Sequence, residues 1–192
     1  MIEKSAIKLL VILFAISILA AFIYFPLSIP IFLFSIFTAY FFRDPERKIG
    51  EGVVSPADGK IDYIDSNRIE IFMSPFDCHV NRSPVSGKVI SIVFREGKLI
   101  PAYKRGKSVR MNEISIQALD GIYKVTQIAG IFARRIVCYV REGDEVKKGQ
   151  KIGLIRFGSR VILELPGGYR FVKKVGEKVK AGETVAMRDE NL

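Results

Sequence analysis

The residues best suited to chemistry are a glycine and the serine that follows it, Gly158-Ser159, near the C-terminal end of the 192-residue sequence. A serine hydroxyl is a poor nucleophile until a neighbouring base accepts its proton. A preceding glycine offers an unhindered carbonyl and tolerates the strained backbone that attack requires. Attack of the Ser159 hydroxyl on the Gly158 carbonyl would turn the peptide bond into an ester. An isolated Gly-Ser is more often a simple turn, so only the motifs around it can make this dipeptide a candidate site of self-cleavage.

Three earlier side chains could also take part in chemistry, two as proton carriers and one as a holder of an anion. His79 is the only histidine, and an imidazole can exchange a proton near neutral pH, although a lone histidine is more often structural. Asp58 could act as a base if it is partly buried, but an aspartate in Pro-Ala-Asp-Gly is also common in turns. Arg82 stays protonated and can hold a phosphate or carboxylate through two hydrogen bonds.

Three motifs, in a fixed order, carry a resemblance to a known family. They are Ser-Pro-Ala-Asp-Gly at 55–59, Met-Ser-Pro-Phe-Asp-Cys-His-Val-Asn-Arg-Ser-Pro at 73–84, and Arg-Phe-Gly-Ser-Arg at 156–160. Together they resemble the short form of the phosphatidylserine decarboxylase family, including its archaeal archaetidylserine relatives. The resemblance covers roughly residues 43–192.

The resemblance implies a proenzyme that cuts itself between Gly158 and Ser159 into a β chain, 1–158, and an α chain, 159–192. Elimination and hydrolysis of the ester would leave a covalent pyruvoyl cofactor derived from Ser159. That ketone would form a Schiff base with the amine of a serine phospholipid and accept electrons as CO2 leaves, giving the ethanolamine lipid. His79 is the implied proton donor to the α-carbon, and Asp58 would assist His79 or activate Ser159.

The chain departs from the long forms of the family at Arg82. Those relatives carry a second histidine there, three residues after the first, and it is implicated in self-cleavage. Arginine cannot be a routine base, so their Asp-His-Ser relay cannot be transferred intact and the base for cleavage stays open. We assign Arg82 to the phosphate or carboxylate of the substrate. Lys104 and Arg105, in a basic segment, are candidates for the lipid phosphate or for a solvated turn.

The N-terminal part predicts a membrane anchor at 1–42. From Leu9 to Phe42 there are 34 residues without a charge, more than the ~20 that one untilted helix needs to span a bilayer. Pro26 and Pro30 predict a break at 27–29, hence a hairpin of two short passes near 9–25 and 29–42. Basic residues flank the run on both sides, which predicts that the domain at 43–192 faces the cytoplasm.

The net charge and the cysteines indicate which binding partners and metals to expect. The formal net charge is +10 and lies almost entirely after residue 42, which favours anionic lipid surfaces. No nucleic-acid-binding signature is present, so nucleic acid is not expected. Cys78 and Cys138 lack metal-ligand spacing and should stay reduced in a cytoplasmic compartment, and no metal is expected. A homo-oligomer and the type of lipid tail, diacyl or archaeal ether, both stay open.

After residue 50 the patterns predict a mainly β (α+β) domain. Residues 69–73 and 109–116 alternate as strands, and Asp120-Gly121 predicts a hairpin into 122–125. The segment 131–140 is ambiguous between strand and short helix, and 95–107 is predicted to be a loop. A weak repeat relates 142–149 to 175–182, with glycines suited to tight corners. This repeat is similar to the barrel-sandwich hybrid of biotinyl and lipoyl carriers, but it lacks their modifiable lysine.

Two other functions compete with the decarboxylase. A membrane-anchored, non-enzymatic barrel-sandwich adaptor would usually carry a long helical hairpin, and no sustained heptad occurs. A membrane serine hydrolase that uses Ser159 would lack the Gly-x-Ser-x-Gly elbow. The appearance of the purified chain as one fragment or two separates these functions.

Overall fold

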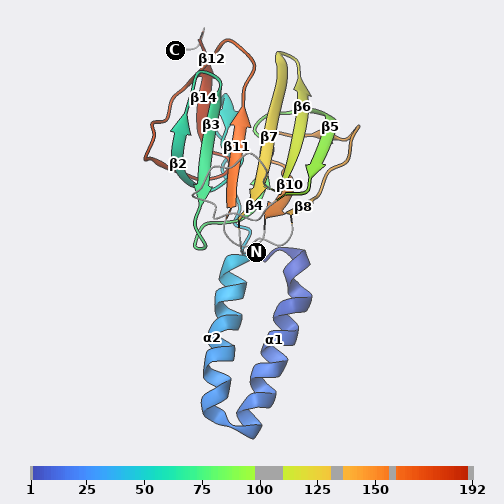
Figure 1. The fold of residues 1–192 in the computed structure, drawn as a ribbon, viewed down its shortest axis with the longest axis vertical. Coiled ribbons are helices and arrows are strands. Elements are labelled where there is room, and N and C mark those ends of the chain that lie inside the picture. The colour runs from blue at the N-terminus through green and yellow to red at the C-terminus, as the bar shows by residue number, and fades with distance from the viewer. Residues whose placement is uncertain (1, 98–109, 131–135, 156–158, 190–192) are drawn as a thin grey trace. The chain divides into compact units, whose positions relative to one another are not determined.

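The computed structural model describes residues 2–97, 110–130, 136–155 and 159–189. The chain divides into two compact units, 1–46 and 47–192. The first unit is helical and the second is built from β-strands (Figure 1). The mainly β fold expected after residue 50 is confirmed. Lys104, Arg105 and Gly158 lie outside the described residues, as does most of the predicted loop at 95–107.

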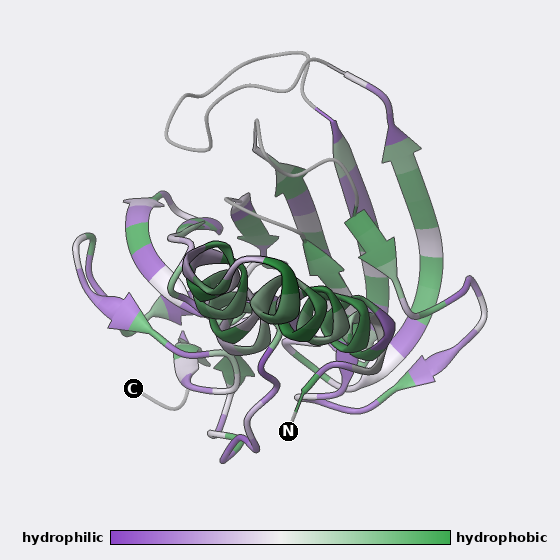
Figure 2. Cartoon of the chain, turned by 90° about the horizontal axis from the view of Figure 1, so that it is seen from below, coloured by the Kyte–Doolittle hydropathy of each residue, from purple (hydrophilic) through white to green (hydrophobic). Residues whose placement is uncertain are grey.

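The first unit is a pair of apolar helices, α1 (Lys4–Ile23) and α2 (Phe25–Phe41). Phe14 and Phe32 meet edge-on with ring centroids 6.0 Å apart. An antiparallel bridge between Ile2 and Arg43 joins the two ends of the pair. Only α1, among the described helices, is long and apolar enough to cross a membrane. Most of both helices is coloured as hydrophobic in Figure 2.

The break between the helices was predicted at 27–29, and that position is wrong. The chain breaks at Tyr24, whose backbone is extended (φ −156°), and α2 continues through both prolines. Pro26 lies in the first turn, where an N–H has no partner within the helix. Pro30 removes a single hydrogen bond, and Ser28 Oγ donates to the Phe25 carbonyl at 2.7 Å nearby. The two passes predicted at 9–25 and 29–42 are therefore replaced by helices at Lys4–Ile23 and Phe25–Phe41.

The described residues of the second unit form three antiparallel sheets. The strands are β1 (Val53–Val54), β2 (Gly59–Ile64), β3 (Arg68–Met73), β4 (Val80–Arg82), β5 (Gly87–Arg95), β6 (Met111–Ala118), β7 (Gly121–Ala129), β8 (Ile136–Cys138), β9 (Glu145–Val146), β10 (Lys151–Ile155), β11 (Ser159–Glu164), β12 (Tyr169–Phe171), β13 (Lys178–Val179) and β14 (Thr184–Arg188). The largest sheet has the order β13-β2-β3-β11-β7-β6-β5-β9, and the two small ones are β1-β14-β12 and β4-β10-β8. The predicted hairpin at Asp120-Gly121 joins β6 to β7, and β8 resolves part of the ambiguous segment as strand.

Strand order reveals a duplicated unit that the sequence only hinted at. One copy, the inserted copy, is continuous and comprises β4 to β10. The other, the outer copy, comprises β1 to β3 and β11 to β14, and it contributes the mirrored half of the large sheet and the matching small sheet. The strand registers of the two copies agree as well. Val53 pairs with Ala186 in the outer copy, and Asn81 pairs with Gly153 at the equivalent position of the inserted copy. The inserted copy is therefore placed between β3 and β11 of the outer copy.

The repeated corners hold the two copies in the same way. In the outer copy the Gly182 N–H donates to the Ser55 carbonyl at 2.9 Å, and in the inserted copy the Gly149 N–H donates to the Ser83 carbonyl at 2.8 Å. Both corner glycines have positive φ, 95° and 80°, a backbone region that favours glycine. The predicted repeat at 142–149 and 175–182 is thus structural. A second repeated stretch is Ser-Pro-x-x-Gly-Lys at 55–60 and 83–88, two segments that sequence reasoning did not relate to each other.

The two faces of β11 lie in different environments. Val161 and Leu163 belong to the hydrophobic core, whereas Arg160, 3% exposed, points to the other face. There its guanidinium pairs with Asp62 at 2.6 Å and with Glu70. A buried charge needs such partners, because desolvation without them is costly.

The charge cluster on β11 leads to a stability prediction. Glu70→Ala should lower the free energy of unfolding by about 3 kcal/mol, because Arg160 loses a buried partner. Glu164→Ala, on the same face but with an exposed ion pair to Arg68 at 3.8 Å, should cost under about 1 kcal/mol. Denaturant unfolding of both variants measures the difference, and equal costs would contradict this account of the cluster.

Candidate processing site

Ser159 is the first residue of β11, a central strand held on both sides. It pairs with Met73 of β3 and with Ala129 of β7, and its side chain is fully buried. The Ser159 Oγ lies 3.2 Å from Met73 Sδ. A thioether is a weak hydrogen-bond acceptor, so this contact orients the hydroxyl without removing its proton. Two β-ladders therefore fix the backbone of the candidate nucleophile.

His79 is fully buried just before β4. Its Nδ1 lies 2.8 Å from the Asp77 carbonyl oxygen. Because a carbonyl can only accept, Nδ1 carries the hydrogen, and Nε2 is the nitrogen left to exchange a proton. The His79 carbonyl accepts a hydrogen bond from the N–H of Ile155, at 3.3 Å. Ile155 ends β10, so His79 is tied to the strand that precedes the cleavage dipeptide.

Asp58 has a structural partner and an ionic one. Its Oδ1 accepts the Ala181 N–H at 2.9 Å, just as Ser86 Oγ accepts the Lys148 N–H at 2.9 Å in the inserted copy. That contact belongs to the repeated corner and not to catalysis. The pair with Arg47, at 2.6 Å, has no equivalent at Ser86. Among the described residues Asp58 makes no hydrogen bond to His79 or Ser159.

Arg82 lies in β4 and uses Nη1 to donate to the Gly149 carbonyl at 3.0 Å. Its backbone N–H donates to the Pro56 carbonyl at 2.9 Å. These contacts attach Arg82 to one motif of each copy, 55–59 and 142–149. The guanidinium that the sequence assigns to the substrate anion is thus itself bonded to the Gly149 carbonyl.

Three buried amides near Ser159 escaped the sequence analysis. Asn112 and Gln127 occupy core-facing positions of β6 and β7, and Asn81 lies in β4. Asn112 donates to Gln127 at 3.0 Å, and Gln127 donates to Asn81 at 2.7 Å. The available signal was an amide at an inward position of an otherwise alternating strand, as in Val125-Thr126-Gln127.

Both cysteines are free thiols. Burial raises the pKa of Cys78 above its usual range, so this thiol stays protonated at neutral pH and is a weak nucleophile. In the part of the chain that the structure describes, no three histidine, cysteine, aspartate or glutamate side chains gather as metal ligands.

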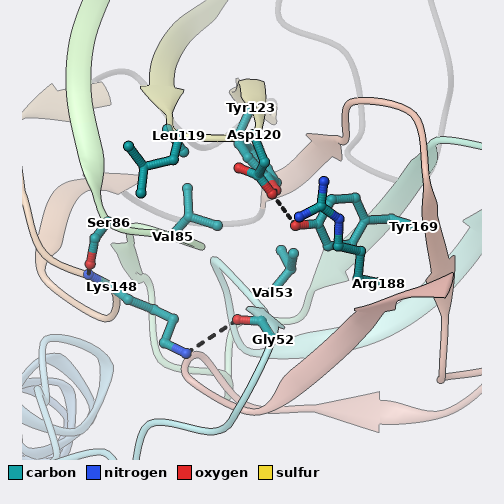
Figure 3. A pocket seen from close by; sticks show the side chains of 11 residues that line it. Gly52, Val53, Val85, Ser86, Leu119, Asp120, Tyr123, Lys148, Tyr169 and Arg188 are labelled. Atoms are coloured by element: carbon teal, nitrogen blue, oxygen red, sulfur yellow. Dashed lines mark hydrogen bonds between the residues drawn. The ribbon is translucent and has the colours of Figure 1, made fainter. Parts of the chain in front are cut away.

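A pocket of about 420 Å³ lies at the far end of β7 (Figure 3). Tyr123, Tyr169 and Asp120 meet in it, and both phenols donate to the same carboxylate oxygen of Asp120. Tyr123 and Ala129 are separated by six positions along β7, which is about 20 Å of strand. The pocket is therefore distinct from the surroundings of Ser159.

The duplication nevertheless relates this pocket to Ser159. Ile71 lies opposite Val161 in the outer copy, and Ile116 lies opposite Tyr123 in the inserted copy. Ser159, two residues before Val161, therefore corresponds to Gly121, two residues before Tyr123. By the same correspondence Ser86, Val53 and Ala118 of the pocket wall match Asp58, Asn81 and Met73. The pocket is the counterpart, in the second copy, of the place where Ser159 lies.

The fold and site define a duplicated β domain with a buried serine at the start of its central strand. The family model of phosphatidylserine decarboxylase matches residues 34–187. A protein of Archaeoglobus fulgidus named as an archaetidylserine decarboxylase proenzyme is 66% identical over 173 residues, which cover 90% of this chain and 89% of the relative. A phosphatidylserine decarboxylase proenzyme of Syntrophus aciditrophicus is 45% identical over 167 residues, which cover 78% of each chain. The chain belongs to the phosphatidylserine decarboxylase family.

The pocket yields a prediction about pH. Burial alone would raise the pKa of Asp120, but hydrogen bonds from Tyr169 and Tyr123 outweigh burial and leave the pKa below its ordinary value. A lowered pKa stabilises the fold above the ordinary carboxyl pKa of about 4, and this stabilisation disappears as the pH falls through the lower folded value. Asp120→Asn should therefore destabilise the protein at pH 7, and its deficit should shrink below about pH 4. A deficit that stays constant over this acid range, measured by melting temperature, would contradict the assignment.

Proposed function

We propose that the chain is a proenzyme that cuts itself between Gly158 and Ser159 and then decarboxylates the serine headgroup of a phospholipid. Family membership, which rests on residues 34–187, carries the proposal. The burial of Ser159 at the start of a strand that is paired on both sides supports the choice of this serine. The adaptor and hydrolase alternatives have no comparable support.

The cut rearranges the bonds of one dipeptide. The Ser159 Oγ attacks the Gly158 carbonyl carbon, the C–N bond breaks, and the hydroxyl proton ends on the Ser159 nitrogen. Loss of the Ser159 α-proton then breaks the Cβ–Oγ bond and releases Gly158 as a carboxylate. The dehydroalanine that is left tautomerises to an imine, and water hydrolyses it to a pyruvoyl group with release of ammonia. A base must take the proton in each step.

Asp58 and His79 are the proposed acid-base groups. His79 would exchange a proton through Nε2, because Nδ1–H is directed to the Asp77 carbonyl. For Asp58 the support is the duplication. Its counterpart is Ser86, and the counterpart of the cleavage dipeptide is the Asp120-Gly121 turn. Ser86 and Asp120 line one pocket. Asp58 is then expected to face Ser159 once its ion pair with Arg47 opens.

The pyruvoyl group fits this position because Ser159 is buried among core strands, where bulk water has little access. Such a group supplies an electron sink for the carbanion formed when CO2 leaves. His79 would protonate the α-carbon of the product. Arg82, with Lys104 and Arg105, would hold the phosphate or carboxylate of the substrate. Relatives named for phosphatidylserine and for archaetidylserine both match, so we commit to the headgroup and leave the tails open.

The remaining parts of the chain are assigned to location and assembly. Residues 1–42 would anchor the protein in the cell membrane as a helical hairpin, since exposed side chains such as Phe22 (87%) and Phe25 (67%) are unfavourable in water. Basic flanks would keep the domain at 43–192 in the cytoplasm. Each copy of the duplicated domain would be a barrel-sandwich-hybrid unit, and the two fragments, 1–158 and 159–192, would stay assembled.

The first prediction concerns the nucleophile. Ser159→Ala should stay uncut and release no CO2 from a serine phospholipid, because no hydroxyl is left to attack. Ser115→Ala, a buried serine on β6, should be cut normally and serves as the control. Denaturing electrophoresis and CO2 release provide the two measurements. Activity of uncut Ser159→Ala would refute the proposed cofactor.

A second prediction concerns the anchor. Removal of residues 1–42 should leave self-cleavage intact, because none of the proposed cleavage residues lies there. The truncated protein should act on detergent-dispersed lipid but poorly on intact vesicles, since it loses lateral access. Equal activity of both forms on vesicles would show that the hairpin is not needed. Docking would then depend on the basic surface, and activity would fall with added salt.

A further inference from the structure

A network of buried polar groups contains amides from three strands and reaches Ser159 through Met73. Asn112 Nδ2 donates to Gln127 Oε1 at 3.0 Å, and Gln127 Nε2 donates to Asn81 Oδ1 at 2.7 Å. Asn81 Nδ2 lies 3.8 Å from Met73 Sδ, which also accepts from the Ser159 hydroxyl at 3.2 Å. None of the three amides is more than 2% exposed.

The Met73 sulfur determines which way each amide of the network is oriented. A thioether can accept a hydrogen bond but cannot donate one. The amide nitrogen of Asn81 must therefore face Met73, and its oxygen must face Gln127. Gln127 then has to present its nitrogen to Asn81 and its oxygen to Asn112. The contacts agree with this order at every step.

The second copy indicates that the fold does not require the amides of Asn81 and Gln127. The counterparts of Asn81, Gln127, Met73 and Ser159 are Val53, Leu165, Ala118 and Gly121, as the strand registers define them. Val53 and Leu165 are buried and belong to the hydrophobic core. Burying an amide costs free energy unless it is fully hydrogen-bonded. The same unit thus packs well without the network where no serine has to react.

The protein also makes room for the central amide. Gly153 of β10 lies against Gln127, and a Cβ atom at this position would come within 2.7 Å of Gln127 Nε2 and of the Val137 carbonyl oxygen. Its counterpart in the outer copy is Ala186. Of these two equivalent positions, the one next to the buried amide of Gln127 is therefore a glycine.

We propose that Asn81, oriented by Gln127 and Asn112, is a positioning residue for self-cleavage. It holds the Met73 sulfur, and the sulfur holds the Ser159 hydroxyl in the rotamer that attacks the Gly158 carbonyl. The acceptor is too weak to take the proton, so Oγ keeps its lone pairs for the attack. This inference rests on the proposed function. Misplacing a reacting atom by about 1 Å can cost about a hundredfold in rate.

The test replaces the network with the residues of the other copy. The double variant Asn81→Val, Gln127→Leu should fold with a melting temperature close to that of the parent, and its self-cleavage should be slowed about tenfold to a hundredfold. Thr126→Val, next to Gln127 on the opposite face and also buried, is the matched control and should cleave at the parental rate. Each full-length chain is made by cell-free synthesis, so that cutting can be followed from the uncut precursor.

Hydroxylamine identifies the step that is affected. It cuts esters but not peptide bonds, so a chain stalled before attack is not accelerated, whereas a chain stalled as the ester is. We expect no acceleration for the double variant. Accumulation of the ester would contradict a role in the attack. An uncut parent chain would refute the proposed function itself, and parental cleavage by the double variant would overturn only the positioning role.

A second variant covers the case in which the double variant fails to fold. Gln127→Glu keeps one donor and one acceptor while the carboxyl is protonated, but offers Asn81 no donor once it ionises. Burial raises the pKa of such a carboxyl toward neutrality. Cleavage by Gln127→Glu relative to Thr126→Val should therefore fall as the pH rises. A constant ratio would contradict the positioning role.

Discussion

Pairing of β11 on both edges is the constraint on which the rest of the domain depends. Each of its residues, Ser159 to Glu164, lies opposite one residue of β3 and one of β7. Buried backbone groups need such partners, because an unpaired one costs about as much as a lost hydrogen bond. A cut just before Ser159 therefore removes no strand from the sheet. The new chain end stays where the ladders hold it, and 159–192 is retained also through β13 and β14.

Duplication explains how the dipeptide that is proposed to react can lie at this point. In the inserted copy the corresponding place is the tight turn Asp120-Gly121 between β6 and β7. In the outer copy the whole inserted copy, β4 to β10, fills the interval between β3 and β11. The motif that contains His79 enters this interval and the motif that contains Gly158 leaves it. Insertion thus places the ends of two distant motifs at one end of the central strands.

The sequence was a good guide to the family and the strands, and a poorer one to the contacts between side chains. Alternation and the Asp-Gly turn predicted β3, β6 and β7 because these strands have one core face each. The repeat predicted the glycine corners but not the duplication, since the copies share little besides Ser-Pro-x-x-Gly-Lys and the corner glycines. The break at Tyr24 was missed because proline is tolerated early in a helix. The network of Gln127 was invisible, because partners on three strands share no local pattern.

The central claim is that Ser159 becomes the modified first residue of a fragment that never leaves the fold. Mass spectrometry of the purified chain, first under native and then under denaturing conditions, tests it most directly. The native spectrum should give one particle that contains 1–158 and 159–192 together. The denatured sample should give a small fragment whose first residue lacks an amine and gains mass with a hydrazine that labels ketones. A fragment that begins with an intact serine, or an active chain of unbroken length, would contradict the account.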